Sequence, residues 1–544
     1  MAHRSIDESM TDERESFDQT DGGNTHVPVE YQQYSKRLRY EFQKGIGLNL
    51  ANQQHTLIQQ RERYLTLLKR HPIHFNEDIF KIPHFRAVFS KALPHDQLGN
   101  VNEEVFYNLV ADLIFKPSSS LRGVIVPNPL KIVSASDIHD AAQLLPDQFN
   151  FPAPPSITSE AVAYEVIELY AMSLMRDIPL NQFATYPLIN SIISELNAVR
   201  GDRPEVTINN LFRGNNYPGP YVSQFLYRQV PMGTYTLNPF FKPYLAGKDY
   251  VLTYPAMINL QNGLVTETLQ FGPNQTLITD LRTGATYFHR DEVLQLGLVA
   301  YLVLRQTGVP LSVKTDARSQ DLLNKTKQSL FNNFGQVDFQ GMMGDVLHIA
   351  GQICWFFKWT LLRIRPEALS ILIDNYINEV GPSYNMSPAI FDSQILAASK
   401  DKFGTYLLSQ AYPEGSPSHP SYPGGHAVFA GATITILKAY YDNDFLLDAF
   451  EPDASGTVLL PLGIKVTVGD ELSKLIRNCG SFRCGAGIHY DSDCRGAELG
   501  EKIAIRYLKI RVLGYNFPVT LTLTKLNGKV IEISNSRCHS HHEA

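Results

Sequence analysis

The sequence is short of the residues that mark several large classes of protein. Only five cysteines occur in 544 residues, which is too few for a disulfide framework. Basic and acidic residues nearly balance, at 48 and 54, so there is no electrostatic footprint for nucleic acid. No uninterrupted apolar run is long enough to cross a bilayer. These absences favour an ordinary globular protein and predict that neither nucleic acid nor a membrane is a partner.

Two local features bear on the cellular compartment. Cys479, Cys484 and Cys494 cluster, but their spacing fits no zinc pattern. Buried free thiols are the preferred interpretation, with a single bridge or a metal site as the alternative. Residues 1–35 are rich in Asp, Glu, Ser and Gln and lack the apolar core of a signal peptide, which predicts a disordered acidic tail. A cytoplasmic location is the expectation that follows.

Helical patterns dominate the rest of the chain, and a 44% hydrophobic content is enough for a large core. Helices are predicted at residues 51–70, 102–115, 135–146, 157–176, 187–199, 290–306, 318–333, 341–379 with an interruption near Pro366, 427–441, 470–480 and 494–511. Residues 200–250 are predicted to be irregular, and 251–288 to hold short strands or turns around Thr266–Leu269 and Leu277–Leu281. Asn527-Gly528 between two alternating runs predicts a hairpin. The expected fold class is all-α with minor β structure.

A turn rich in proline and glycine, residues 417–427, precedes an apolar run that predicts a buried helix. Gly424, Gly425 and His426 therefore lie where a loop becomes a helix N-terminus. Unpaired backbone N–H groups and the positive end of the helix dipole meet there, which suits an oxyanion. Many helices begin after a glycine turn without binding anything, so this pattern alone leaves both interpretations open.

Two cations lie in a second apolar segment. Lys358 and Arg365 are seven residues apart, nearly two helical turns, so both are expected to point the same way. Pro366 disfavours helical geometry at Arg365 and is expected to end the helix there. The flanking aromatic residues predict a buried helix, and buried cations need an anion. A solvated cationic stripe is the alternative.

Arg483 and His489 flank a third segment, a turn of small residues, although His489 alone could equally be a core histidine. Together the three segments read Lys-x6-Arg-Pro, Pro-x-Gly-His and Arg-x5-His. On these motifs the chain resembles the type 2 phosphatidic acid phosphatase and vanadium haloperoxidase superfamily. The longer stretches Pro417-Ser-His-Pro-Ser-Tyr-Pro, Arg365-Pro-Glu-Ala and Gly487-Ile-His-Tyr resemble the algal and cyanobacterial vanadium bromoperoxidases. The resemblance covers roughly residues 40–535.

The resemblance implies an all-α fold with two four-helix-bundle cores. The N-terminal arm and first bundle would span residues 36–310, and residues 311–544 would form the second bundle with the anion site and the C-terminal hairpin. The cofactor implied is vanadate. The enzyme expected is a haloperoxidase that oxidises bromide or iodide with hydrogen peroxide, giving a hypohalous-acid equivalent that halogenates a small organic acceptor. A homo-oligomer is also expected.

The resemblance also implies a role for each motif residue. The cofactor-binding residues would be three cations, two glycines and a histidine, namely Lys358, Arg365, Gly424, Gly425, Arg483 and His489. His489 would be the axial metal ligand, and Asp493, four residues later, is a candidate to orient it. The catalytic residues would be His426, His419 and Lys358, with the two histidines handling protons as peroxide binds.

Two positions depart from the family. Gly424 stands where the family has Ser, whose hydroxyl bonds the anion, and losing one such bond weakens binding by about tenfold to a hundredfold. Phe357 stands where red-algal relatives carry Arg, which leaves the halide preference open. One alternative function is a soluble acid phosphatase, with His489 as nucleophile and His426 as proton donor. Another is a redox-silent relative that binds vanadate weakly.

Overall fold

The computed structural model describes residues 87–103, 105, 106, 109, 146–315, 330–381, 384–515 and 517–535. Contacts divide the chain into Met1–Gln60 and Arg61–Ala544, and every described residue belongs to the second unit. The predicted acidic tail and the predicted helix at 51–70 lie outside the described residues. So do nearly all of 135–146 and most of 102–115 and 318–333.

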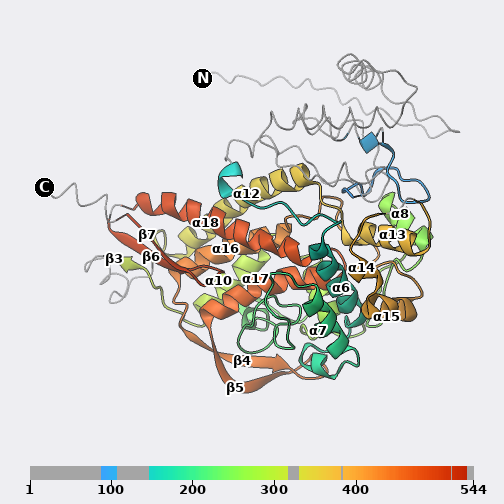
Figure 1. Ribbon diagram of the computed structural model, residues 1–544. Helices are drawn as coiled ribbons and strands as arrows, with labels where there is room; N and C mark the ends of the chain where they lie inside the picture. The colour runs from blue at the N-terminus through green and yellow to red at the C-terminus, as the bar shows by residue number, and fades with distance from the viewer. Residues whose placement is uncertain are drawn as a thin grey trace, which may run out of the picture. The chain divides into compact units, whose positions relative to one another are not determined.

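Helices dominate the described part of the chain, which confirms the all-α class (Figure 1). They are α6 (Glu160–Leu174), α7 (Ile189–Ala198), α8 (Tyr254–Gln261), α9 (Leu281–Tyr287), α10 (Gln295–Gln306), α12 (Gln336–Leu361), α13 (Pro366–Ile377), α14 (Pro388–Phe391), α15 (Gln394–Phe403), α16 (Gly425–Tyr440), α17 (Val468–Gly485) and α18 (Gly496–Leu513). The short 3-10 helices are η2 (Pro146–Phe149), η3 (Leu180–Thr185), η4 (Gln224–Leu226) and η5 (Asp491–Arg495). The two-bundle arrangement and the boundary near residue 310 stay predictions.

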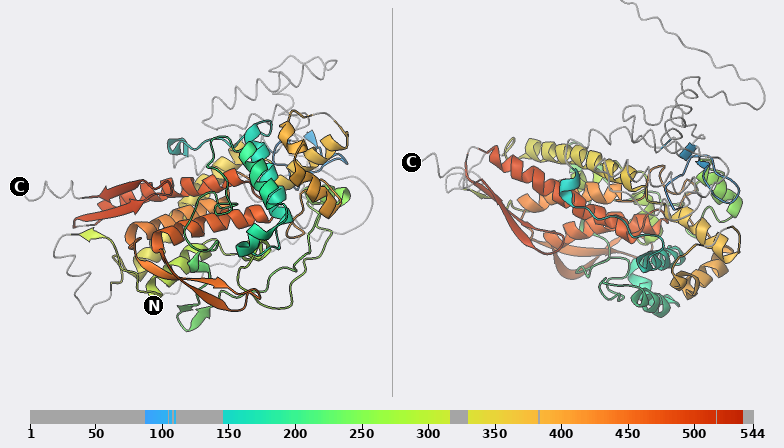
Figure 2. Two further views of the ribbon diagram at one scale, coloured as in Figure 1. Left: turned by 60° about the horizontal axis from the view of Figure 1, so that its bottom comes forward. Right: turned by 45° about the horizontal axis from the view of Figure 1, so that its top comes forward.

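Strands are short and form three small antiparallel sheets among the described residues. They are β1 (Val230–Met232), β2 (Tyr235–Leu237), β3 (Lys314–Thr315), β4 (Leu446–Pro452), β5 (Leu459–Thr467), β6 (Val519–Thr524) and β7 (Val530–Ser534). Strand β1 pairs with β2, and β4 pairs with β5. The predicted C-terminal hairpin is confirmed as β6–β7, with β3 added at its edge. Figure 2 shows this red hairpin alongside the red helix α18, which it contacts.

Helix α16 is the central element, in contact with α10, α12, α17 and α18. Only His426 and Phe429 among its residues escape full burial. Glycines let α18 approach closely, because a Cβ at Gly431 would lie 2.2 Å from the Ala497 carbonyl oxygen. A Cβ at Gly500 would lie 2.1 Å from that of Val428. The N-terminus of α16 is thereby fixed by backbone-to-backbone packing.

The prediction of strands or turns over residues 251–288 is wrong, since α8 and α9 lie there and only isolated bridges at Phe271 and Thr276 have β character. Each helix is too short to display a hydrophobic period, and a cap marks its start. Thr253 accepts from the Ala256 N–H, and Asp280 forms a capping box with Thr283. Helix α15 and the β4–β5 hairpin were not predicted, whereas 200–250 carries only short elements, as expected.

Two further expectations concern composition. The described cysteines, Cys354, Cys479, Cys484 and Cys494, are all free. Buried free thiols were predicted for the last three, and of these Cys479 and Cys484 are buried whereas Cys494 is partly exposed. Among the described helices none combines the length and hydropathy that crossing a membrane requires. The described residues also hold no group of three or more histidine, cysteine or acidic side chains suited to a metal ion.

The contact between α16 and α18 can be tested at one glycine. Gly500→Ala forces a methyl group against the α16 backbone and is expected to lower the free energy of unfolding by about 1–3 kcal/mol, measured by urea denaturation. Gly344→Ala on α12 is the control, because its Cβ would meet nothing within 4 Å and alanine favours the helix. Equal stability of the two variants would contradict this packing.

Candidate anion-binding site

The predicted site residues converge around the N-terminus of α16. The Lys358 Nζ donates to the carbonyl oxygens of Pro420 at 2.9 Å and Ser421 at 3.0 Å. The Arg365 Nε donates to the His419 carbonyl oxygen at 2.9 Å. Two cations thus hold one three-residue stretch of the loop that leads into α16, so the loop and the cations fix each other.

Lys358 and Arg365 converge, but the predicted cause, helical spacing along one helix, is wrong. Helix α12 ends at Leu361, and Leu362 is left-handed with φ of 46°. Arg365 is extended, with φ of −81° and ψ of 152°, and caps the next helix, α13, which begins at Pro366. Lys358 and Arg365 therefore sit on different elements and meet because the chain turns between them.

The third motif cation, Arg483, and the three histidines complete the cluster. The Arg365 Nη1 donates to the Ile488 carbonyl oxygen at 2.9 Å and lies 3.1 Å from the His489 Nε2, while its Nη2 lies 3.1 Å from the His419 Nδ1. The Arg483 Nη1 donates to the Phe288 carbonyl oxygen at 2.6 Å and lies 3.4 Å from the His426 Nε2. The structure brings all three cations and all three histidines together.

These cations are buried without counter-ions. Lys358, Arg365 and Arg483 are 0%, 1% and 4% exposed, and no described carboxylate forms an ion pair with them. Other buried cations are paired, such as Arg176 with Asp249 and Lys474 with Glu471. Among the described residues, the other buried cations without an ion pair are Arg213, held by backbone carbonyls, and Lys438, held by a hydroxyl. Three uncompensated positive charges in one buried place require an anion.

Burial close to other positive charges lowers the pKa values of Lys358, Arg365 and two of the histidines. Burial, helped by the positive charges of Arg365 and Arg483, lowers the pKa of Lys358 to about 7. Burial likewise lowers the pKa of Arg365 to about 10. The pKa values of His419 and His489 fall well below the usual value, because both rings are buried beside cations. The two imidazoles are therefore neutral at physiological pH.

His489 is held in one orientation by Asp493. The His489 Nδ1 lies 2.7 Å from the Asp493 Oδ2, which also accepts from the Ser421 hydroxyl and the Tyr490 N–H. A proton on Nδ1 leaves the Nε2 lone pair directed to the cation cluster, as a metal-ligating histidine needs. The Asp493 carboxylate stays ionised, because Arg363 and His489 outweigh burial and lower its pKa.

Several residues of the site gave no signal in the sequence. The Asp291 carboxylate lies 2.9 Å from the His426 Nε2, although 135 positions separate the two. The Arg363 Nη1 donates to Asp493 at 3.1 Å and its Nη2 to Glu165 at 2.7 Å, so α6 braces the segment after His489. Only folding brings these partners into contact, and no local spacing could have found them.

The loop 412–424 is anchored by a further buried ion pair. The Lys91 Nζ lies 2.7 Å from the Glu367 Oε1 and donates to the Glu414 and Ser416 carbonyl oxygens. The other Glu367 oxygen accepts from the Ser416 N–H at 2.7 Å. Glu367 lies two residues after Arg365, so the pair ties the loop to the start of α13. Glu367 is therefore no counter-ion for Arg365.

The two glycines begin α16, as predicted, with Gly424 as N-cap. The Gly424 N–H donates to the Asp493 carbonyl oxygen at 2.9 Å. No described residue accepts from the N–H groups of Gly425, His426 or Ala427, which are free for an anion. A Cβ at Gly424 would lie 3.0 Å from that same Asp493 oxygen, so a serine needs a small backbone shift. Phe357 packs in the core against Phe151.

Comparisons with known proteins agree with this geometry. Residues 346–511 match the family model described as the VCPO second helical-bundle domain. The chain is 29% identical over 570 residues to a vanadium-dependent bromoperoxidase of Corallina pilulifera, covering 86% of this chain and 93% of the relative. It is 28% identical over 497 residues to one of Ascophyllum nodosum, covering 82% and 86%.

One solved structure shares the fold. It is titled the homohexameric structure of the second vanadate-dependent bromoperoxidase from Ascophyllum nodosum. The TM-score is 0.76 at 23% identity, and the match covers 96% of this chain and 94% of the other. At that identity the likeness establishes the fold alone.

The lowered pKa of Lys358 predicts a pH dependence of anion binding. Below about pH 7 the amine is charged and binds an anion directly, whereas above it a proton must first be taken up. The affinity of the vanadate-free protein for sulfate, whose charge is constant here, should fall by up to about tenfold per pH unit above about 7. Calorimetry measures it. The arginine in Lys358→Arg keeps its charge, so the sulfate affinity of this variant should not depend on pH in this range. A pH dependence that persists in the variant would show that a group other than Lys358 takes up the proton.

The anchor at Lys91 can be tested by removing one partner. Lys91→Met leaves the Glu367 carboxylate buried without a cation and should lower the free energy of unfolding by about 3–5 kcal/mol. Lys465→Met is the control, because its ion pair with Asp448 is exposed and its loss should leave stability nearly unchanged. Urea denaturation compares the two, and a Lys91→Met protein as stable as its control would refute the anchoring role.

Proposed function

We propose that this chain is a vanadium-dependent haloperoxidase, which binds vanadate at the anion site and oxidises halide with hydrogen peroxide. The observation that carries this proposal is the cluster of three buried cations without carboxylate partners. They lie beside a histidine whose unprotonated Nε2 faces the Arg365 guanidinium, and beside a helix N-terminus with unpaired N–H groups. Such a set suits a tetrahedral, multiply charged oxyanion whose central atom accepts a nitrogen ligand.

The donor set fits vanadate in its chemistry. Lys358, Arg365 and Arg483 would hold its oxygens, and the Nε of Arg483 is a buried donor with no hydrogen-bond partner among the described residues. The Gly425 N–H would add a neutral donor, and the Nε2 of His489 would bind the metal. When bound, vanadate supplies a Lewis-acidic centre that activates hydrogen peroxide toward attack by halide, without changing its oxidation state.

The chain's own residues supply charge and protons. Three fixed cations in a buried site stabilise negative charge that develops on oxygen, more strongly than they could in water. Converting halide and hydrogen peroxide to hypohalous acid and water consumes one proton. His426 is placed to relay it, because its partly exposed ring presents Nε2, which lies 2.9 Å from the buried Asp291 carboxylate and 3.4 Å from the Arg483 Nη1. His419, bonded to Arg365, is the second proton-handling group.

Substrate range and assembly extend the proposal. Bromide and iodide are the proposed halides, since the relatives are named bromoperoxidases, and a small organic molecule is the proposed acceptor. A homo-oligomer is proposed because the solved structure of like fold is titled homohexameric.

The direct test supplies orthovanadate, hydrogen peroxide and bromide to the purified protein and measures bromination of an activated phenol. Turnover that depends on all three is expected, and His489→Ala should abolish it by removing the metal ligand. Absence of turnover at saturating vanadate would overturn the proposal. Hydrolysis of a phosphate ester that vanadate inhibits would instead identify a phosphatase, because phosphate and vanadate share shape and charge.

The glycine at the N-cap predicts weak vanadate binding that a hydroxyl can repair. Gly424→Ala and Gly424→Ser both place a Cβ against the Asp493 carbonyl, so only the hydroxyl distinguishes them. The serine variant should bind vanadate about tenfold to a hundredfold more tightly than the alanine variant. Equilibrium dialysis with metal analysis measures both dissociation constants. Equal constants would show that the position 424 hydroxyl does not reach the anion.

A further inference from the structure

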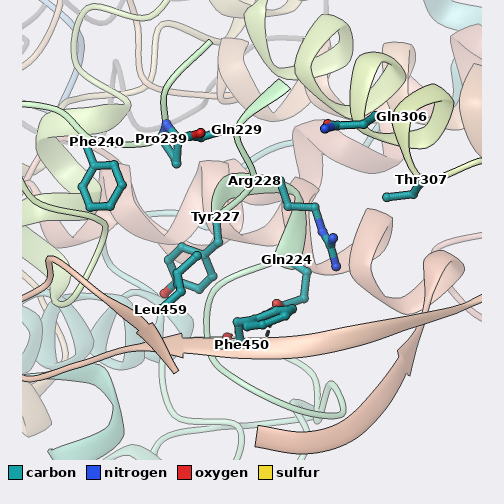
Figure 3. A pocket seen from close by; sticks show the side chains of 10 residues that line it. All are labelled: Gln224, Tyr227, Arg228, Gln229, Pro239, Phe240, Gln306, Thr307, Phe450 and Leu459. Carbon is teal, nitrogen blue, oxygen red and sulfur yellow. Dashed lines mark hydrogen bonds between the residues drawn. The ribbon is translucent and has the colours of Figure 1, made fainter. Parts of the chain in front are cut away.

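A pocket lies apart from the anion site and shares no residue with it. It has a volume of about 540 Å³ and lies between η4, the end of α10 and the β4–β5 hairpin (Figure 3). Pockets of this size accommodate small organic molecules. Tyr227, Phe240, Phe450 and Leu459 give it mainly apolar walls.

Arg228 is the single charged residue among those that line this pocket. Its Nη2 donates to the Asp448 carbonyl oxygen at 3.1 Å, and its guanidinium lies 5.8 Å from the centre of the Phe450 ring. The Asp448 carboxylate is engaged by Lys465 at 2.6 Å and forms no ion pair with Arg228. The Arg228 Nε is buried and has no hydrogen-bond partner among the described residues. The guanidinium is thus held in place with donors to spare.

Hydrogen bonds fix the side chains that line the pocket around Arg228. The Gln224 amide is fully engaged with the Phe450 backbone, donating to its carbonyl oxygen at 3.0 Å and accepting from its N–H at 2.8 Å. The Tyr227 hydroxyl donates to the Ile278 carbonyl oxygen at 3.0 Å, which leaves its ring as a wall. A ligand would therefore meet apolar ring surfaces and one cation already oriented.

We infer that this pocket is a binding site for an organic monoanion with an apolar, ring-sized body, such as an aryl carboxylate. One guanidinium that forms no ion pair with a described carboxylate matches one negative charge, and its planar fork pairs well with a carboxylate. The aromatic and aliphatic walls match the body. Inorganic anions lack that body, so the pocket selects a different class of ligand from the anion site.

Calorimetry on the full-length protein at low ionic strength tests this site with two probes, 3-phenylpropanoate and its neutral amide. The wild type should bind the carboxylate saturably and the amide at least about tenfold more weakly. Arg228→Gln should reduce affinity for the carboxylate to that for the amide. Lys529→Gln, which removes an exposed charge from the turn of the C-terminal hairpin, should change neither. Leu459→Trp should fill the pocket and abolish binding of both the carboxylate and the amide.

Three outcomes would overturn the inference. The first is no saturable binding of 3-phenylpropanoate up to about 10 mM. The second is unchanged affinity in Arg228→Gln, provided that circular dichroism shows the variant folded. The third is displacement of the probe by orthovanadate, which would place it at the anion site. Because no step of this test measures turnover, its result is independent of the proposed haloperoxidase activity.

Discussion

The structure depends on positive charge that the protein does not neutralise. Lys358, Arg365 and Arg483 are buried together and bonded to backbone carbonyls, and no described carboxylate pairs with any of them. Desolvated cations repel one another, and the lowered pKa of Lys358 records that repulsion together with burial. An anion bound among them would relieve both effects at once. The fold is therefore prepared for an oxyanion before one arrives.

In contrast, the cations that surround this cluster form ion pairs with carboxylates. Arg363 joins Glu165 of α6 to Asp493, and Asp493 in turn orients His489. Lys91 joins Glu367 to the loop that carries His419. Ion pairs thus hold the segments that present the cations and histidines, while the cations themselves are left for a ligand. The residues that support the site are thus distinct from those left to bind a ligand. The pairs of Arg363 with Glu165 and Asp493, and of Lys91 with Glu367, join residues far apart in the sequence.

The motifs predicted which residues form the site, but local reasoning misjudged how they meet. Lys358 and Arg365 were expected on one helix at helical spacing, whereas a left-handed Leu362 ends α12 and places Arg365 at the start of α13. Helices α8 and α9 escaped prediction because caps rather than periodicity define them. The long periodic helices and the Asn-Gly hairpin were predicted well, because those signals lie within a few residues of one another.

By itself the sequence predicted the helical class and the glycine turn at the start of α16, and its motifs, through the resemblance to a known family, predicted the three cations and three histidines of the site. Each of these is written in residues adjacent in the chain or in motifs of fixed spacing. Tertiary structure alone decided that the cations lack carboxylate partners and that Asp291 pairs with His426. It also decided that Arg228 lines a separate apolar pocket. Pairing and burial of charge depend on distances across the fold, which no local pattern contains.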